Sequence, residues 1–163
     1  MGYTVSVQQV ESRWIAAARG NATSKAVAGT MLGLLSKAWD FVKKSGIKTD
    51  GQNVAIYKVH VIEAGARVFE RFEGSGDIEC VPSPSGLAAV AIHMGPYELL
   101  GRAHEAIVDW AKTNGRELEG TNWEVYGHHE DDPARRRTDV FYLLRPQDSQ
   151  PRQAKPPVPP QTR

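Results

Sequence analysis

The sequence predicts an α+β fold in which one antiparallel sheet carries two long helices and a central cleft. Three observations lead to this prediction. Short segments of alternating apolar and polar residues flank two stretches whose apolar residues recur at helical spacing. These signals occur twice, each time in the order strand, strand, helix, strand, strand. The two halves also share identical residues at a constant offset of 69 positions.

The first half contains one helix between two pairs of strands. Its predicted elements are strands at 3–10 and 14–19, a helix at 24–45, and strands at 53–62 and 66–73. Gly46 is typical of a residue that ends a helix. The last strand is expected to begin after Gly65, so the turn between the last two strands is expected at 63–65.

The second half repeats this order. Strands are predicted at 77–81 and 87–94, and the second of them ends at His93 and Met94. Pro96 then opens a helix, in the first turn, where proline is tolerated. The apolar stripe of this helix consists of Leu99, Leu100, Ala103, Ile107, Trp110 and Ala111. Gly115 ends the helix, Gly120 turns the chain into a strand that contains 123–126, and a final strand covers 137–144.

An internal repeat connects the two halves, which span about 3–74 and 77–146. Aligning 38–57 with 107–126 gives six identical residues in twenty positions. Some of these are glycines that similar turns would require, but the matches Asn53 with Asn122 and Tyr57 with Tyr126 are not explained in that way. We therefore interpret the chain as a duplication, with two helices on one sheet related by an approximate twofold axis. The groove between the helices is the expected ligand site.

The strand 123–126 is the most informative stretch for function. Alternation puts Glu124 and Tyr126 on one face and Trp123 and Val125 on the other. The repeat is broken here, because Ala55 occupies the position equivalent to Glu124. Only one of the two half-sites therefore carries a negative charge.

Bulk composition excludes several classes of protein. A net charge of +1 and a pI near 7.9 give no basic field for direct nucleic-acid binding. No apolar run has the roughly 20 residues of a membrane-spanning helix, and the start of the chain lacks a signal-peptide pattern. Cys80 is the single cysteine and cannot form an internal disulfide. We expect a cytoplasmic protein with one domain at 1–146 and a proline-rich, disordered tail at 147–163.

A run of acidic residues and histidines resembles a metal site. It comprises His128, His129, Glu130, Asp131 and Asp132. Neighbouring histidines on an extended chain point apart, and no second cluster completes a set of ligands. We therefore expect no metal and no cofactor.

Several motifs together resemble a known family, the GyrI-like small-molecule-binding domain. These motifs are 95–98 at the start of the second helix, Asn114 and Gly115 at its end, the strand 123–126, and the closing strand 138–144. The family forms the effector-binding domain of multidrug-sensing transcription activators such as BmrR and Rob. The resemblance covers about residues 3–146 and implies two pseudo-symmetric halves of the SHS2 type. Because little precedes Tyr3, the chain resembles the stand-alone members of the family.

The resemblance implies a pocket in which a glutamate attracts amphipathic, cationic molecules. The family glutamate corresponds to Glu124, and the tyrosine after the Gly-Pro turn corresponds to Tyr97. Other stand-alone relatives hydrolyse strained cyclopropane-containing toxins, which would make Glu124 a general base and Tyr97 a proton donor. Others inhibit DNA gyrase, which would imply a protein partner. The residues alone do not separate binding from hydrolysis, because both would use the same aromatic cage.

The remaining candidate ligand-binding residues are mainly aromatic. Tyr57 and Tyr126 are the best of them, because they share the face of Glu124 or of its equivalent. The others are Trp39, Trp110, Tyr142 and His93. Each could instead be a packed core residue, and a lone histidine at the end of a strand is more often a structural hydrogen-bonding residue.

Overall fold

The computed structural model describes residues 2–21 and 27–147, and the predicted tail from residue 148 onward lies outside this range. The first half comprises β1 (Ser6–Val10), β2 (Trp14–Asn21), α1 (Val27–Ser45), β3 (Thr49–Lys58) and β4 (Val61–Val68). The second half comprises β5 (Ile78–Pro82), β6 (Gly86–Met94), a 3₁₀ turn (Tyr97–Leu99), α2 (Gly101–Thr113), β7 (Leu118–Tyr126), a second 3₁₀ turn (Pro133–Arg135) and β8 (Arg137–Leu144).

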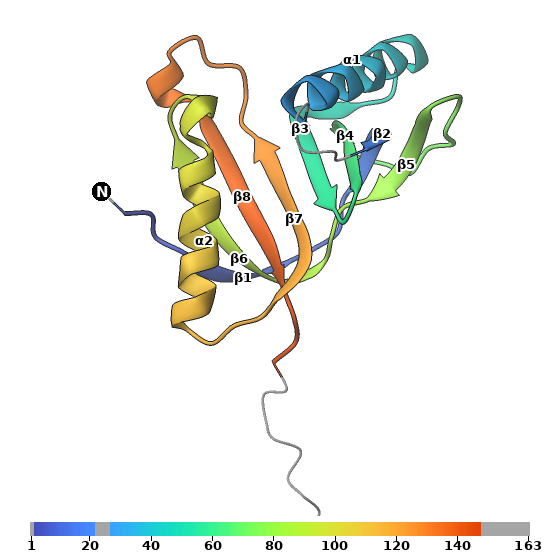
Figure 1. Cartoon of the computed structure of the whole chain (residues 1–163). Coiled ribbons are helices and arrows are strands. Elements are labelled where there is room, and N and C mark those ends of the chain that lie inside the picture. Colours follow the sequence, from blue (N-terminus) through green and yellow to red (C-terminus); the bar gives the residue numbers. More distant parts are fainter. Residues whose placement is uncertain (1, 22–26, 148–163) are drawn as a thin grey trace, which may run out of the picture.

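All eight strands form one antiparallel sheet in the order β1-β6-β8-β7-β3-β4-β2-β5. The α+β fold and its two halves of two strands, a helix and two strands are thus confirmed. α1 packs on β2 and β4, and α2 packs on β6 and β8, as Figure 1 shows. Side chains of both helices join a single hydrophobic cluster, so both helices cover the same face of the sheet. No helix in the described part of the chain is long and apolar enough to cross a membrane.

The strand order reads identically from both ends once β1–β4 are matched with β5–β8. The approximate twofold axis therefore passes between β3 and β7, the two central strands. In their register Ala55 is opposite Glu124, with Asn53 opposite Tyr126 and Tyr57 opposite Asn122 on either side. The axis thus passes through the pair of Ala55 and Glu124, the position at which the internal repeat is broken.

Each half gives its first strand to the other half. β1 pairs with β6, and β5 pairs with β2, in five paired positions each. β1 and β5 are short strands. Each is followed by a three-residue connection, 11–13 after β1 and 83–85 after β5, that leads to a strand on the other side of the sheet. The two repeats are therefore interlocked parts of one domain.

The turn between β3 and β4 lies at Val59 and His60, so the prediction of a turn at Gly65 was wrong. Lys58 pairs with Val61 across this two-residue turn. His60 has a φ of 66°, a left-handed conformation that histidine adopts more readily than most side chains. Gly65 instead lies inside β4, where an added Cβ atom would be 1.7 Å from the backbone oxygen of Ala16. Glycine is required there because β2 approaches β4 closely.

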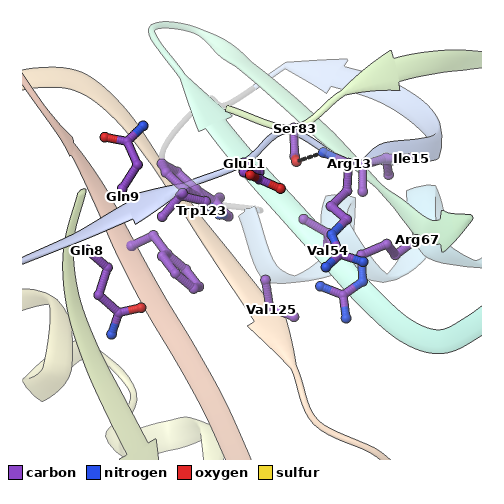
Figure 2. A pocket seen from close by; sticks show the side chains of 12 residues that line it. Gln8, Gln9, Glu11, Arg13, Ile15, Val54, Arg67, Ser83, Trp123 and Val125 are labelled. Carbon is purple, nitrogen blue, oxygen red and sulfur yellow. Dashed lines mark hydrogen bonds between the residues drawn. The ribbon is translucent and has the colours of Figure 1, made fainter. Parts of the chain in front are cut away.

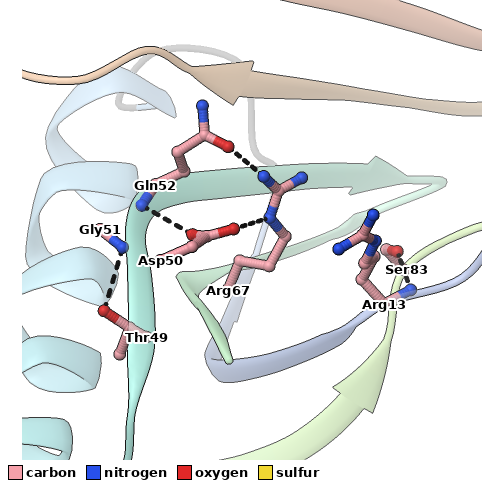
Figure 3. A network of polar contacts seen from close by, with 7 residues as sticks. All are labelled: Arg13, Thr49, Asp50, Gly51, Gln52, Arg67 and Ser83. Carbon is pink, nitrogen blue, oxygen red and sulfur yellow. Dashed lines mark hydrogen bonds and ion pairs between the residues drawn. The ribbon is translucent and has the colours of Figure 1, made fainter. Parts of the chain in front are cut away.

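Gly51 and Gly120 also lie inside strands, although Gly120 was predicted as a turn before its strand. Their φ angles are 81° and 119°, and the strand pairing shifts register close to each of them. These matching irregularities are bulges, in which glycine supplies the left-handed residue. Around Gly51, Arg67 is held by ion pairing to Asp50 and by the side-chain oxygen of Gln52, as Figure 3 shows.

Two other boundaries differ from the sequence prediction. β1 begins at Ser6 instead of residue 3, and the Tyr3 side chain before it contacts His93, with 2.7 Å between the Tyr3 hydroxyl and Nδ1. The second helix begins with a 3₁₀ turn after Pro96 before the α-helical part starts at Gly101.

The sheet face opposite the helices carries a second apolar cluster. The rings of Trp123 and Phe141 stack there at 5.0 Å with an angle of 4° between their planes. A cleft of about 350 Å³ lies beside them. Figure 2 shows the residues that line it, among them Gln8 of β1 and Val54 of β3. The predicted alternation in β7 is confirmed, because Trp123 lies on this face and Tyr126 lies on the helix face.

Candidate ligand-binding site

Glu124 is buried between the sheet and the helices, with 5% of its surface exposed. Both of its carboxylate oxygens accept hydrogen bonds. Oε1 is 2.7 Å from Nε2 of His104, and Oε2 accepts from the hydroxyl of Tyr126. The carboxylate is thus fixed from two sides at the pseudo-twofold axis.

His104 links α2 to this carboxylate. Its other ring nitrogen, Nδ1, is 2.8 Å from the hydroxyl of Tyr142 on β8. His104 was not among the predicted site residues, although the sequence contains a signal for it. His104 follows Ala103 and precedes Ile107 by one turn, so it is a polar residue on the apolar stripe of its helix. A histidine in that position faces the sheet.

The symmetry-related positions in the first half are apolar. The offset of 69 relates His104 to Leu35, and Glu124 to Ala55. β4 and β8 flank the two central strands. Ala64 of β4 lies opposite Ala55, and Val140 of β8 lies opposite Glu124, so these two residues are equivalent. Two positions further along each strand, Ala66 is therefore equivalent to Tyr142. The hydrogen-bonded series Tyr142–His104–Glu124 therefore corresponds to alanine, leucine and alanine. The negative charge therefore lies in one half of the site only.

The hydroxyl groups of Tyr57 and Tyr126 meet at the sulfur of Met31 on α1. The distances from their oxygens to Sδ are 3.4 and 3.1 Å. Burial first, and the negative charge of Glu124 second, raise the pKa of both phenols. The same two causes raise the pKa of Tyr142 to about 12. All three phenols are therefore neutral hydrogen-bond donors at neutral pH.

These pKa shifts predict the alkaline titration of the protein. We expect Tyr57, Tyr126 and Tyr142 to stay protonated in the folded chain at about pH 11, whereas tyrosines of an unfolded chain titrate near pH 10. The phenolate absorbance of the native protein at that pH should stay at or below two-fifths of the value in denaturant, because the chain has five tyrosines. Since the folded pKa values are the higher ones, ionisation above pH 10 favours unfolding. Full phenolate absorbance in a protein that is still folded would contradict the prediction.

A cavity of about 290 Å³ lies beside Tyr126, between α1 and the second half. Its wall is formed by Met31, Leu32, Leu35, Gly51, Asn53, Tyr97, Tyr126, Gly127 and His129. The ring of Tyr97 meets that of Tyr126 edge-on at 5.8 Å and is 48% exposed at the mouth. The guanidinium group of Arg136 lies 5.3 Å from the centre of the Tyr97 ring. The cavity thus has an apolar wall from α1 and an aromatic wall backed by Glu124.

Comparison with solved structures identifies the fold. The C-terminal domain of EcmrR superposes with a TM-score of 0.70 at 18% identity, covering 89% of this chain and 99% of that domain. The chain has the GyrI-like fold. EcmrR in its complex with DNA gives a TM-score of 0.72 at 19% identity over 87% of this chain, which spans only 57% of that longer chain.

Two further solved structures share the fold, one of a protein with a bound ligand and one of a hydrolase. SAV2435, solved with bound tetraphenylphosphonium, has a TM-score of 0.62 at 11% identity, covering 91% of this chain and 97% of that one. A hydrolase from Listeria innocua has a TM-score of 0.54 at 8% identity, covering 88% and 93%. No protein-family model and no curated protein matches the sequence.

The GyrI-like fold gathers five of the eight predicted site residues around the axis: Glu124, Tyr126, Tyr57, Tyr142 and Tyr97. Trp39 lies behind the cavity wall, where its indole nitrogen donates to the side-chain oxygen of Asn53 at 2.5 Å. Trp110 is partly buried and packs against the core under the helices. That these residues contact a ligand is a prediction.

His93 lies elsewhere in the GyrI-like fold, at the end of β6. It is 2% exposed, and its ring nitrogens lie 2.7 Å from the Tyr3 hydroxyl and 3.0 Å from the backbone oxygen of Pro96. These contacts tie the N-terminal segment to the turn that precedes Tyr97. Among residues 2–21 and 27–147 no group of three or more histidine, cysteine, aspartate or glutamate side chains is arranged to hold a metal ion.

Proposed function

We propose that this chain binds lipophilic organic cations in the cavity beside Tyr126, with Glu124 as the counter-charge. The observation that carries the proposal is a buried carboxylate at the centre of the fold. Taking a carboxylate out of water costs several kcal/mol unless an opposite charge or hydrogen bonds compensate it. Within the described residues no lysine or arginine nitrogen lies within 4.0 Å of Glu124. A ligand cation would supply a permanent positive charge to pair with this carboxylate.

The walls of the cavity suit the rest of such a ligand. Tyr97 and Tyr126 present aromatic rings, and each cation–π contact contributes about 0.5–2 kcal/mol. Met31, Leu32 and Leu35 offer apolar and, in the case of methionine, adaptable surface from α1. Few directional contacts are present on that side, which favours a broad range of ligand shapes. The tetraphenylphosphonium bound by SAV2435, which shares the fold, is a lipophilic cation of this class.

The proposal is tested by comparing a cation with a neutral molecule. Binding of tetraphenylphosphonium and of triphenylphosphine oxide would be followed by tryptophan fluorescence, because Trp39 is bonded to Asn53 in the cavity wall. We expect Glu124→Gln to weaken cation binding at least tenfold, or about 1.4 kcal/mol, and to change neutral binding little. Glu98→Gln, which removes an exposed carboxylate beside Tyr97, is the matched control and should behave like the native chain.

An unchanged ratio of the two affinities in Glu124→Gln would refute the role of the carboxylate. Absence of saturable cation binding to the native protein would refute the proposed function itself. Circular dichroism of each variant distinguishes a loss of binding from a loss of fold.

Hydrolysis at the same site is the second candidate function, because a hydrolase shares the fold and because Glu124 and Tyr97 both contact Tyr126. In this reading Glu124 acts as general base on a water molecule and Tyr97 donates a proton. Mass spectrometry of a cyclopropane-containing alkylating agent after incubation separates the two functions. Turnover that is lost in Glu124→Ala supports hydrolysis, and an unchanged compound supports binding alone.

A further inference from the structure

The empty site already contains a candidate for the charge that balances Glu124. Nε2 of His104, at 2.7 Å, is the one basic nitrogen within 4.0 Å of the carboxylate in the described part of the chain. Because a carboxylate oxygen can only accept, Nε2 must carry the hydrogen of this bond. The charge of the ring then depends on whether Nδ1 carries a second hydrogen.

In the described part of the chain, two ionisable groups are hydrogen-bonded to the His104 ring. They are Glu124 on β7 and Tyr142 on β8. On α2 itself, the residues one turn away are Leu100, Gly101, Ile107 and Val108, none of which ionises. β6 presents alanines to the core beneath α2, and the ring nitrogens of its His93 are bound to Tyr3 and Pro96. The carboxylate of Glu124 is therefore the charged group that is in direct contact with the His104 ring.

We propose that His104 is protonated in the empty site and releases this proton when an organic cation binds beside Glu124. This inference rests on the proposed function and deepens it. In the empty protein the imidazolium balances the buried carboxylate. A bound cation takes over that role, and two positive charges beside one carboxylate would repel each other. His104 thus acts as an internal cation that the ligand replaces.

The hydrogen bonds of the site permit this exchange without leaving a buried group unpaired. In the imidazolium, Nδ1–H donates to the oxygen of Tyr142, 2.8 Å away. When the Nδ1–H bond breaks, its electron pair stays on nitrogen and the proton goes to the buffer. The hydroxyl of Tyr142 then turns and donates to Nδ1, while Nε2–H still donates to Glu124. The raised pKa of Tyr142 keeps its hydroxyl hydrogen available for this purpose. The His104 side chain is 22% exposed, which gives the proton a path to water.

This exchange makes His104 a specificity-determining residue. A neutral ligand leaves the imidazolium in place and gains nothing from Glu124, which is already compensated. A cation gains the carboxylate but must displace a proton, so its affinity rises as the pH rises. Where one proton leaves per ligand bound, linkage predicts about a tenfold gain in affinity per pH unit.

Isothermal titration calorimetry measures the released proton directly. Tetraphenylphosphonium would be titrated into the full chain at one pH, between about pH 5.5 and 8, in two buffers of different ionisation enthalpy. The difference in apparent binding enthalpy gives the number of protons released. We expect a number that approaches one at the acidic end and falls toward zero at the alkaline end. Triphenylphosphine oxide should release none at any pH.

Two variants and one control variant identify the source of the proton. His104→Gln keeps a donor to Glu124 and should bind the cation without proton release. Tyr142→Phe removes the hydroxyl that would donate to the neutral ring, so it should reduce the release at a given pH. His60→Asn removes a histidine from the distant β3–β4 turn, at a left-handed position that asparagine tolerates, and should match the native protein.

The outcomes separate this inference from the proposed function. Cation binding without proton release in the native protein, or with equal release in His104→Gln, overturns the inference and leaves the proposed function standing. No cation binding overturns the proposed function as well. If His104→Gln does not fold, the ¹⁵N shifts of the native His104 ring with and without tetraphenylphosphonium decide the matter, because they distinguish imidazolium from neutral imidazole.

Discussion

Replacement of Gly65 by alanine is expected to destabilise the protein by more than about 3 kcal/mol. The new methyl group would lie 1.7 Å from the backbone oxygen of Ala16, a distance that no rotation of a side chain can relieve. Gly65 also pairs with Val54 on its other side, so β4 cannot move away without disturbing the central strands. The stability would be measured by urea unfolding, and the melting temperature should fall by about 6 °C or more.

Gly33→Ala is the matched control for this substitution. Gly33 lies in α1, and nothing lies within 4 Å of the position that its Cβ atom would occupy. Alanine favours a helix over glycine by about 1 kcal/mol, so this variant should be neutral or more stable. Equal stability of Gly65→Ala and the native protein would show that β2 and β4 are further apart than the structure places them.

Placing a second carboxylate at the symmetry axis is expected to have a comparable effect. Ala55 is fully buried and lies directly opposite Glu124. Opposed residues of this kind have Cβ atoms about 4.5–5.5 Å apart, so Ala55→Glu would create two facing carboxylates in the core. The position equivalent to His104 is Leu35, which supplies no positive charge. We expect a loss of about 4 kcal/mol or more at neutral pH.

Ala55→Gln separates the charge from the volume of the new side chain. Its cost should be only the 1–3 kcal/mol or so that overpacking of a core usually causes. The difference between the two variants should shrink as the pH is lowered from about 7 to 4, because two close carboxylates come to share a proton. Chemical denaturation at several pH values gives both quantities. A constant difference would show that the charge of Glu124 is not felt at position 55.

The sequence was sufficient to predict the number of helices, the order of the strands along the chain and the faces of β7. These features follow from local periodicity, and the repeat added the approximate axis. The face shared by Glu124 and Tyr126 was predicted because side chains alternate along a strand. The pairing of β1 with β6 was not predicted, since no local pattern records which distant strand lies at the edge of a sheet.

Two failures of the sequence prediction have clear physical causes. Gly65 was taken for a turn because glycine serves both for turns and for close approach of two backbones, and only the neighbouring strand decides between them. The actual turn uses Val59 and His60, which carry no strong turn signal. His104 was overlooked because its function depends on Glu124, twenty positions later, and on Tyr142, which is further still.

The exchange of β1 and β5 between the halves limits how a ligand can enter. Proteins built from two hinged lobes admit a ligand by swinging the lobes apart. Here such a movement would break the central β3–β7 pairing, and it would be restrained by the two three-residue connections, 11–13 and 83–85, through which the chain crosses from one side of the sheet to the other. Opening the sheet is therefore the costly route of entry for the ligand of the proposed function. On the proposed function, the less costly route is a local rearrangement above the sheet, at α1 and at the exposed ring of Tyr97, and the motion of these parts should set the rate of ligand uptake.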